Sequence, residues 1–152
     1  MRALSKLFST LLNLGFLPYA PGTIASAITV IFWYIFIQFF SIFMFAIFIL
    51  MITILSIYLV NIYMEDLLSE DPSEVVVDEF IGQSIPLMFL THNSEIFEIL
   101  FAFICFRIFD IYKIYPVNLG EKMKGSIGVI SDDIIAGIYT VIFLMIYKII
   151  FY

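Results

Sequence analysis

The sequence predicts an all-α membrane protein, a polytopic bundle of about four to five membrane helices with an N-terminal interfacial amphipathic helix. Hydrophobic residues make up 63% of the 152 residues and charged residues 13%, and the mean hydropathy is +1.11, which is typical of membrane proteins. Residues 7–64 carry no charge, whereas residues 106–137 hold eight of the twenty charged side chains. We expect a single domain, residues 1–152. With seven basic residues and a net charge of −6, nucleic acid is not an expected partner.

Residues 1–17 have the pattern of an amphipathic helix. Apolar side chains recur at helical spacing, and polar side chains occupy the opposite face. The apolar set is Leu4, Leu7, Phe8, Leu11 and Leu12, and the polar set is Arg2, Ser5, Lys6, Ser9 and Asn13. Because no small-x-small cleavage site follows, we interpret this segment as a retained helix in the membrane interface rather than a signal peptide.

Pro18, Pro21 and Gly22 interrupt the chain after this helix, and Thr23 is placed to N-cap the next one. The free N–H groups at such a helix start would suit a phosphate oxygen, although an ordinary capped turn explains the residues equally well. The 42 uncharged residues that follow Gly22 would reach about 63 Å as one helix. A hydrocarbon core is about 30 Å thick, so we expect two spans, 24–38 and 43–63, with a turn near 39–42.

Residues 65–79 form a polar segment. Asp71, Pro72 and Glu74 match a helix start, with the aspartate as N-cap and the proline at the first helical position. Asp78 and Glu79 differ, because they lie between apolar residues where adjacent carboxylates are costly without a partner. We therefore expect these two residues to be functional.

The remaining helices are expected at residues 80–90, which are short and contain Pro86, at 96–111 and at 134–152. If 80–90 crosses the membrane, even partly, then residues 21–26, 65–79 and 107–133 share one face. Six of the seven Lys and Arg residues would lie there, so the positive-inside rule makes that face cytoplasmic. His92 falls on the other face, and Cys105, the single cysteine, is expected to be a small buried filler.

The charged residues of 106–137 allow two interpretations. Arg107, Asp110 and Lys113 are spaced so that each neighbouring pair can form an ion pair, but the two cations would also hold a phosphate. Gly125 and Gly128 predict a flexible loop. Ser131 would cap the last helix, and acids in its first turn, Asp132 and Asp133, would suit the helix dipole.

Several phosphatase mechanisms do not fit the composition. A histidine nucleophile needs more than one histidine, a cysteine phosphatase needs a C-x5-R motif, and the aspartyl-phosphate and CDP-alcohol phosphotransferase patterns are absent. Carboxylates that hold Mg²⁺ remain, since a set made only of oxygen ligands favours Mg²⁺ over zinc.

Four ordered segments resemble the phosphatidylglycerophosphatase A family. They are Pro-Gly-Thr-x-x-Ser at 21–26, Asp-Pro-x-x-Val-Val-x-Asp-Glu-x-x-Gly-Gln at 71–83, Phe-Arg-x-Phe-Asp-x-x-Lys-x-x-Pro at 106–116, and Gly-Val-x-x-Asp-Asp-x-x-Ala-Gly at 128–137. The resemblance implies a Mg²⁺-dependent, multi-pass enzyme of the bacterial inner membrane, with its active site on the cytoplasmic face. It would hydrolyse phosphatidylglycerophosphate to phosphatidylglycerol and phosphate. Ala25 and Ser126 stand where the family usually has glycine, and Ile114 where it usually has proline.

The resemblance and the residue pattern together give three sets of candidate site residues. The catalytic set is Asp78, Glu79, Asp132 and Asp133. The phosphate-binding set is Thr23, Arg107 and Lys113. The metal-binding set is Asp71, Asp78, Glu79, Asp110, Asp132 and Asp133. The alternative hypothesis is a non-catalytic small membrane transporter or scaffold whose charges form a salt-bridged network at the helix ends.

Overall fold

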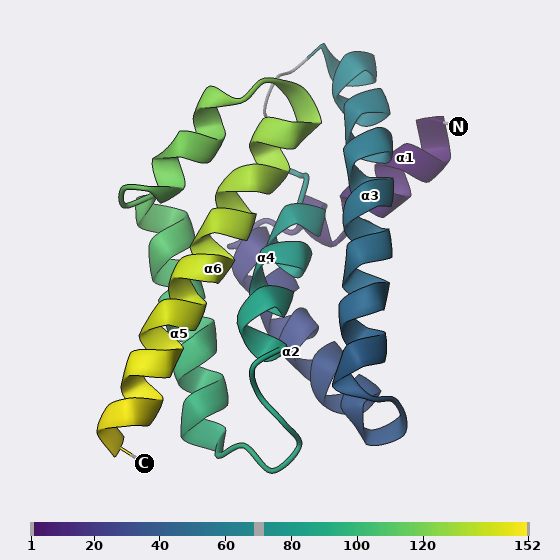
Figure 1. The fold of residues 1–152 in the computed structure, drawn as a ribbon. Coiled ribbons are helices and arrows are strands. Elements are labelled where there is room, and N and C mark those ends of the chain that lie inside the picture. Colours follow the sequence, from purple (N-terminus) through teal and green to yellow (C-terminus); the bar gives the residue numbers. More distant parts are fainter. Residues whose placement is uncertain (1, 69–71, 152) are drawn as a thin grey trace.

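The computed structural model describes residues 2–68 and 72–151, and within this part the chain forms helices and their connections (Figure 1). The elements are α1 (Arg2–Ser9), η1 (Leu14–Phe16), α2 (Pro21–Phe39), α3 (Ile42–Leu67), α4 (Val77–Leu87), α5 (Ile96–Tyr112), η2 (Val117–Lys122) and α6 (Gly125–Phe151), where η marks a 3₁₀ helix. α4 lies in the middle of the bundle and contacts α2, α3, α5 and α6 (Figure 1). The predicted all-α class is confirmed.

Three helices, α2, α3 and α6, are long and apolar enough to cross a membrane. Between 22% and 28% of each candidate span is buried inside the protein, so most of its apolar surface needs lipid as solvent. α5, with 17 residues, stands at the lower limit of about 17 residues for a crossing helix. The chain is therefore a membrane protein.

The first apolar run divides into two helices, as expected. α2 ends at Phe39 and α3 begins at Ile42, although the connection has neither glycine nor proline. Ser41 instead provides the start signal, because its hydroxyl accepts a hydrogen bond from the backbone N–H of Met44 at 3.3 Å. The predicted turn near 39–42 is confirmed.

α4 has 11 residues, or about 16 Å of helix, and is too short to cross alone. Figure 1 shows it descending through the centre of the bundle, after which residues 88–95 continue to the start of α5. α3 and α5 thus both finish, and α6 begins, at the same end of the bundle, which we call the polar end. The turn that carries His92 lies at the opposite end (Figure 1).

The N-terminal helix is shorter than expected. α1 ends at Ser9, because residues 11–13 adopt left-handed backbone angles. Ser5 and Ser9 are buried, whereas Leu4 and Leu12 are exposed. α1 packs against α3, and Arg2 forms an ion pair with Asp66 at 3.0 Å. The two serines therefore face the protein together with the partly buried Phe8, whereas Leu4 and Leu7 are exposed and remain available to the membrane interface.

Two helix starts differ from the prediction. α4 begins at Val77 rather than at Pro72, because the backbone N–H of Val76 is bonded to Ser9 and the Glu74 carboxylate accepts a bond from the Tyr63 hydroxyl at 3.0 Å. The proposed N-cap, Asp71, lies outside the described residues. Thr23 is also not a cap, since α2 already begins at Pro21.

The last helix begins nine residues earlier than expected, at Gly125, where φ is +69°. Gly128 lies inside this helix and lacks the β-carbon that would collide with the Met123 carbonyl oxygen. The two glycines therefore allow close packing rather than a flexible loop. Ser131 is not a cap, and Asp132 and Asp133 lie two turns into α6 rather than in its first turn.

Replacing Gly137 with alanine tests the packing of α4 on α6. The added methyl group would lie 2.5 Å from the Gly82 carbonyl oxygen and 3.0 Å from the Ile85 side chain, and overpacking of this kind costs about 1–3 kcal/mol. We expect a lower Tm for the protein in detergent, followed by circular dichroism. Ile138→Val removes one methyl group from a residue that is 50% exposed and should leave the Tm nearly unchanged. Equal Tm values for the two variants would contradict this packing.

Candidate active site

Three carboxylates from two helices meet at the polar end. Asp78 and Glu79 lie in the first turn of α4, and Asp133 lies two turns into α6. One oxygen atom of each lies within 4.8 Å of the other two. The helices approach closely enough because Gly82 has no side chain: a β-carbon there would lie 2.6 Å from the Asp133 carbonyl oxygen. We call Asp78, Glu79 and Asp133 the carboxylate trio.

Asp78 and Asp133 are buried, Glu79 is partly buried, and the trio is incompletely hydrogen-bonded. Asp78 is 8% exposed and Asp133 is 3% exposed. Within the described residues, Asp78 Oδ1, Glu79 Oε2 and Asp133 Oδ2 are buried without a hydrogen-bond partner. Burial, and then the adjacent Glu79 carboxylate, raise the pKa of Asp78 well above its ordinary value, and burial raises the pKa of Glu79. Such a group is costly when ionised unless a cation offsets its charge, so the residues present fit a divalent metal ion.

Two cations, Arg107 in α5 and Lys113 immediately after it, lie beside the trio, and each is paired with another carboxylate. Arg107 Nη1 lies 2.6 Å from Asp110 Oδ2 and 3.9 Å from Glu79 Oε1. Lys113 Nζ lies 2.7 Å from Asp132 Oδ2. The predicted Arg107–Asp110 pair is confirmed. Arg107 Nε is buried without a hydrogen-bond partner among the described residues, so this guanidinium retains a donor for a further acceptor.

The start of α2 completes the site from a third direction. A β-carbon on Gly22 would collide with Glu79 Oε1 and lie 3.3 Å from Arg107 Nη2, so a larger residue there would displace the Glu79 carboxylate. One turn later, the Ser26 hydroxyl accepts a bond from Arg107 Nη1 at 3.3 Å and donates one to the Gly22 carbonyl at 2.9 Å. Ser26 positions Arg107, a role that the sequence alone did not reveal.

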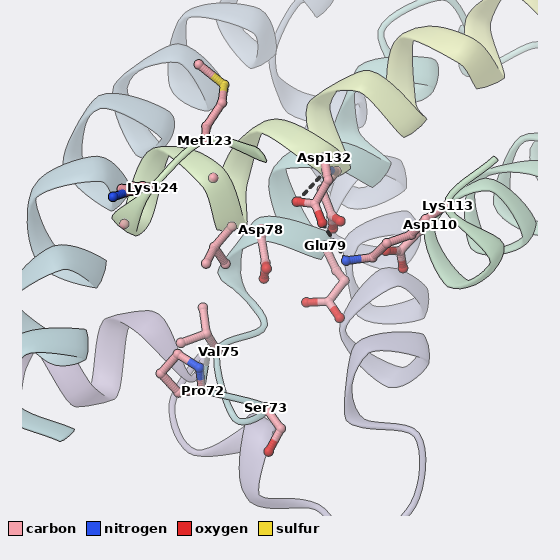
Figure 2. Close-up of a pocket in the computed structure, with 14 residues that line it drawn as sticks. Pro72, Ser73, Val75, Asp78, Glu79, Asp110, Lys113, Met123, Lys124 and Asp132 are labelled. Carbon is pink, nitrogen blue, oxygen red and sulfur yellow. Dashed lines mark hydrogen bonds and ion pairs between the residues drawn. The ribbon is translucent and has the colours of Figure 1, made fainter. Parts of the chain in front are cut away.

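A cavity of about 510 Å³ lies in front of the trio. Residues 72–75 border one side and residues 123–129 another, and Figure 2 shows the Asp78, Glu79 and Asp132 carboxylates at its wall with Lys113 beside them. Its lining joins acidic and basic side chains, and so suits an anionic group held together with a cation.

The structure brings most of the predicted residues together. The cavity is lined by Asp78, Glu79, Asp110, Lys113, Asp132 and Asp133. Arg107 lies behind this wall through its contacts with Glu79 and Asp110. Thr23 lies next to Gly22 in the first turn of α2 and is partly buried, and its phosphate-binding role stays a prediction. Asp71 cannot be placed, since it lies outside the described residues.

Sequence reasoning also missed Lys124 and Gly120. Lys124 lines the cavity and is exposed. A β-carbon on Gly120 would lie 2.5 Å from the Cα of Asp132, so this glycine lets η2 support the helix turn that carries Asp132. Cys105 is partly buried beside the cluster of Phe106, Phe109 and Ala136, rather than fully buried as expected.

Comparison with known proteins gives consistent matches. The family described as phosphatidylglycerophosphatase A matches residues 7–148. Phosphatidylglycerophosphatase A of Escherichia coli is 31% identical over 125 residues, which cover 82% of this chain and 72% of that protein. A Bacteroides thetaiotaomicron protein, provisionally named as a phosphatidylinositol-3-phosphatase, is 36% identical over 143 residues, covering 91% and 90%. No solved structure matches significantly. The chain therefore belongs to the phosphatidylglycerophosphatase A family and is a phosphatase of phosphoric monoesters.

Proposed function

We propose that this protein removes the terminal phosphate of phosphatidylglycerophosphate, giving phosphatidylglycerol and inorganic phosphate, with Mg²⁺ held by the carboxylate trio. The observation that carries the proposal is the group of buried, unpartnered oxygens of Asp78, Glu79 and Asp133. A metal ion would supply the positive charge that the three carboxylates can bind. A phosphomonoester would supply the anion that the flanking cations can bind. Family membership and the named Escherichia coli relative support the substrate.

The bound metal ion and the residues around the trio would have different roles in the reaction. Bound Mg²⁺ would neutralise charge on the phosphate and lower the pKa of water. Lys113, which lines the cavity, would bind a phosphate oxygen. Arg107, which lies behind the cavity wall, would hold the Glu79 and Asp110 carboxylates in place. Asp132 lies next to the trio, where Lys113 and the backbone N–H of Asp133 fix its orientation. It is thereby placed to accept a proton from an attacking water molecule.

The charges also favour an orientation in a bacterial inner membrane. Arg2, Lys6, Arg107, Lys113 and Lys124 all lie toward the polar end, whereas Lys148 lies near the opposite end, 3.4 Å from the Phe89 carbonyl oxygen. The positive-inside rule therefore puts the polar end, and with it the active site, in the cytoplasm.

A second substrate has specific support from the Bacteroides relative, which covers more of the chain than the Escherichia coli protein does. Phosphatidylinositol 3-phosphate also carries a phosphomonoester on the head group of a phospholipid, so the same trio and cations would serve it. By contrast, the scaffold hypothesis expects acids that are all satisfied by ion pairs, and the unpartnered oxygens of the trio argue against it.

Removing the metal tests the proposed chemistry. We expect the purified protein to release inorganic phosphate from phosphatidylglycerophosphate in mixed micelles with Mg²⁺, and to lose this activity with excess chelator. Adding Mg²⁺ back should restore it, because the trio would again be neutralised. Activity that persists in chelator would contradict the metal, and a folded sample that is inactive under both conditions would contradict the substrate. Phosphatidylinositol 3-phosphate, assayed in parallel, distinguishes the two candidate substrates.

The Asp133→Asn substitution tests the trio directly. We expect kcat to fall by on the order of 10²–10³-fold, because several kcal/mol of metal-dependent stabilisation would be lost. In the absence of metal the Tm should stay equal or rise, since a buried charge beside two other carboxylates is removed. Glu65→Gln makes the same chemical change at an exposed residue and is the matched control. A lower Tm with a normal kcat would instead mean that Asp133 supports the fold and is not needed for turnover.

A further inference from the structure

A second hollow, about 350 Å³ in volume, lies between α3 and α6 beside the carboxylate cavity. Its walls are mainly apolar, with Ile54, Ile57 and Tyr58 from α3 and Ile127 from α6. These four side chains are all exposed, and both helices are candidate membrane spans. The hollow is therefore a groove that faces the lipid.

Lys124 connects the groove to the carboxylate cavity, because it lines both. It immediately precedes α6, whose start is fixed against α3. The Ser126 hydroxyl donates a 2.7 Å hydrogen bond to the Ile57 carbonyl oxygen, and a β-carbon on Gly125 would lie 3.5 Å from Asn61 Oδ1. The backbone of Lys124 is thus held at the junction by its neighbours.

The charge of Lys124 is available for a ligand. Arg107 and Lys113 are each paired with a carboxylate. Among the side chains that the structure describes, which do not include those of Leu119, Glu121 and Lys122, none forms an ion pair with Lys124. It is also exposed. A cation at this junction lies between a site suited to a phosphomonoester and an apolar surface suited to acyl chains.

The substrate chemistry supplies a matching anion, if the proposed function is correct. Phosphatidylglycerophosphate has a terminal phosphomonoester and, closer to the acyl chains, a phosphodiester joined to diacylglycerol. Phosphatidylinositol 3-phosphate has the same order of groups. When the phosphomonoester occupies the cavity, the rest of the bound lipid has to extend toward the bilayer. The groove beyond Lys124 offers an apolar surface along that direction.

We propose that Lys124 binds the phosphodiester of the lipid substrate, and that the groove between α3 and α6 receives the adjoining diacylglycerol. This contact lies away from the bond that is cleaved, so it strengthens binding of the ground state and the transition state equally. Lys124 is then a specificity residue that distinguishes a phospholipid bearing a terminal phosphate from a small soluble phosphomonoester.

The test compares KM and kcat for phosphatidylglycerophosphate in mixed micelles. We expect Lys124→Gln to raise KM about tenfold and to leave kcat within about twofold, which is the signature of lost uniform binding. Lys124→Arg keeps the charge and should restore a KM near that of the wild type. Lys6→Gln removes a positive charge from α1 at the same end and is the matched control, with no change expected.

Three outcomes would overturn this inference while leaving the proposed function intact. They are an unchanged KM in Lys124→Gln, a fall in kcat at constant KM, which would place the lysine on the phosphomonoester, and a KM in Lys124→Arg as high as in Lys124→Gln. Absence of turnover by the wild-type protein would refute the proposed function itself, and this inference with it. If Lys124→Gln fails to fold, Ile127→Trp fills the groove instead, and an unchanged KM in that variant overturns the inference.

Discussion

α4 and α6 pack so closely that a β-carbon on Gly137 would lie 2.5 Å from the Gly82 carbonyl oxygen. This backbone approach, made possible by small residues as in many membrane helix pairs, brings Asp133 to Asp78 and Glu79. The same contact buries Asp78 and Asp133, with Glu79 partly buried beside them, which raises the cost of ionising the three carboxylates. α2 and α5 then add their parts around that charge. Gly22 lets α2 reach Glu79, and Ser26 holds Arg107 beside it.

Much of this arrangement could be predicted from the sequence. The uncharged length of residues 7–64 exceeds one membrane thickness, which predicts both α2 and α3. Adjacent acids such as Asp78 and Glu79 are rare beside apolar segments, so their position alone predicted a functional role. Counting crossings put the three polar segments at one end of the bundle, and the contacts of Arg107 with Ser26 and Glu79 agree. The family resemblance is confirmed by a match over residues 7–148.

Other features were hidden because tertiary contacts override local signals. Pro72 and Glu74 match a helix start, yet α4 begins later. The Glu74 carboxylate instead accepts a hydrogen bond from the Tyr63 hydroxyl, and the Val76 N–H donates one to the Ser9 carbonyl oxygen. Gly128 is a residue type common in loops, but it lies within α6, where the helix backbone packs against the Met123 carbonyl group. The trio itself joins residues more than fifty positions apart, and helical periodicity carries no information about which faces of α4 and α6 meet. Lys124 had no signal in the sequence beyond its charge.

The most direct test of the central claim is equilibrium binding of Mn²⁺, a spectroscopic substitute for Mg²⁺, measured by electron paramagnetic resonance on the purified protein. This measurement needs no substrate, so it examines the carboxylate trio separately from catalysis. We expect saturable binding by the wild type that competes with Mg²⁺ and is weakened at least about tenfold in Asp78→Asn. Equal binding by the wild type and the variant, or no saturable binding by a folded wild type, would contradict a metal site at these three residues.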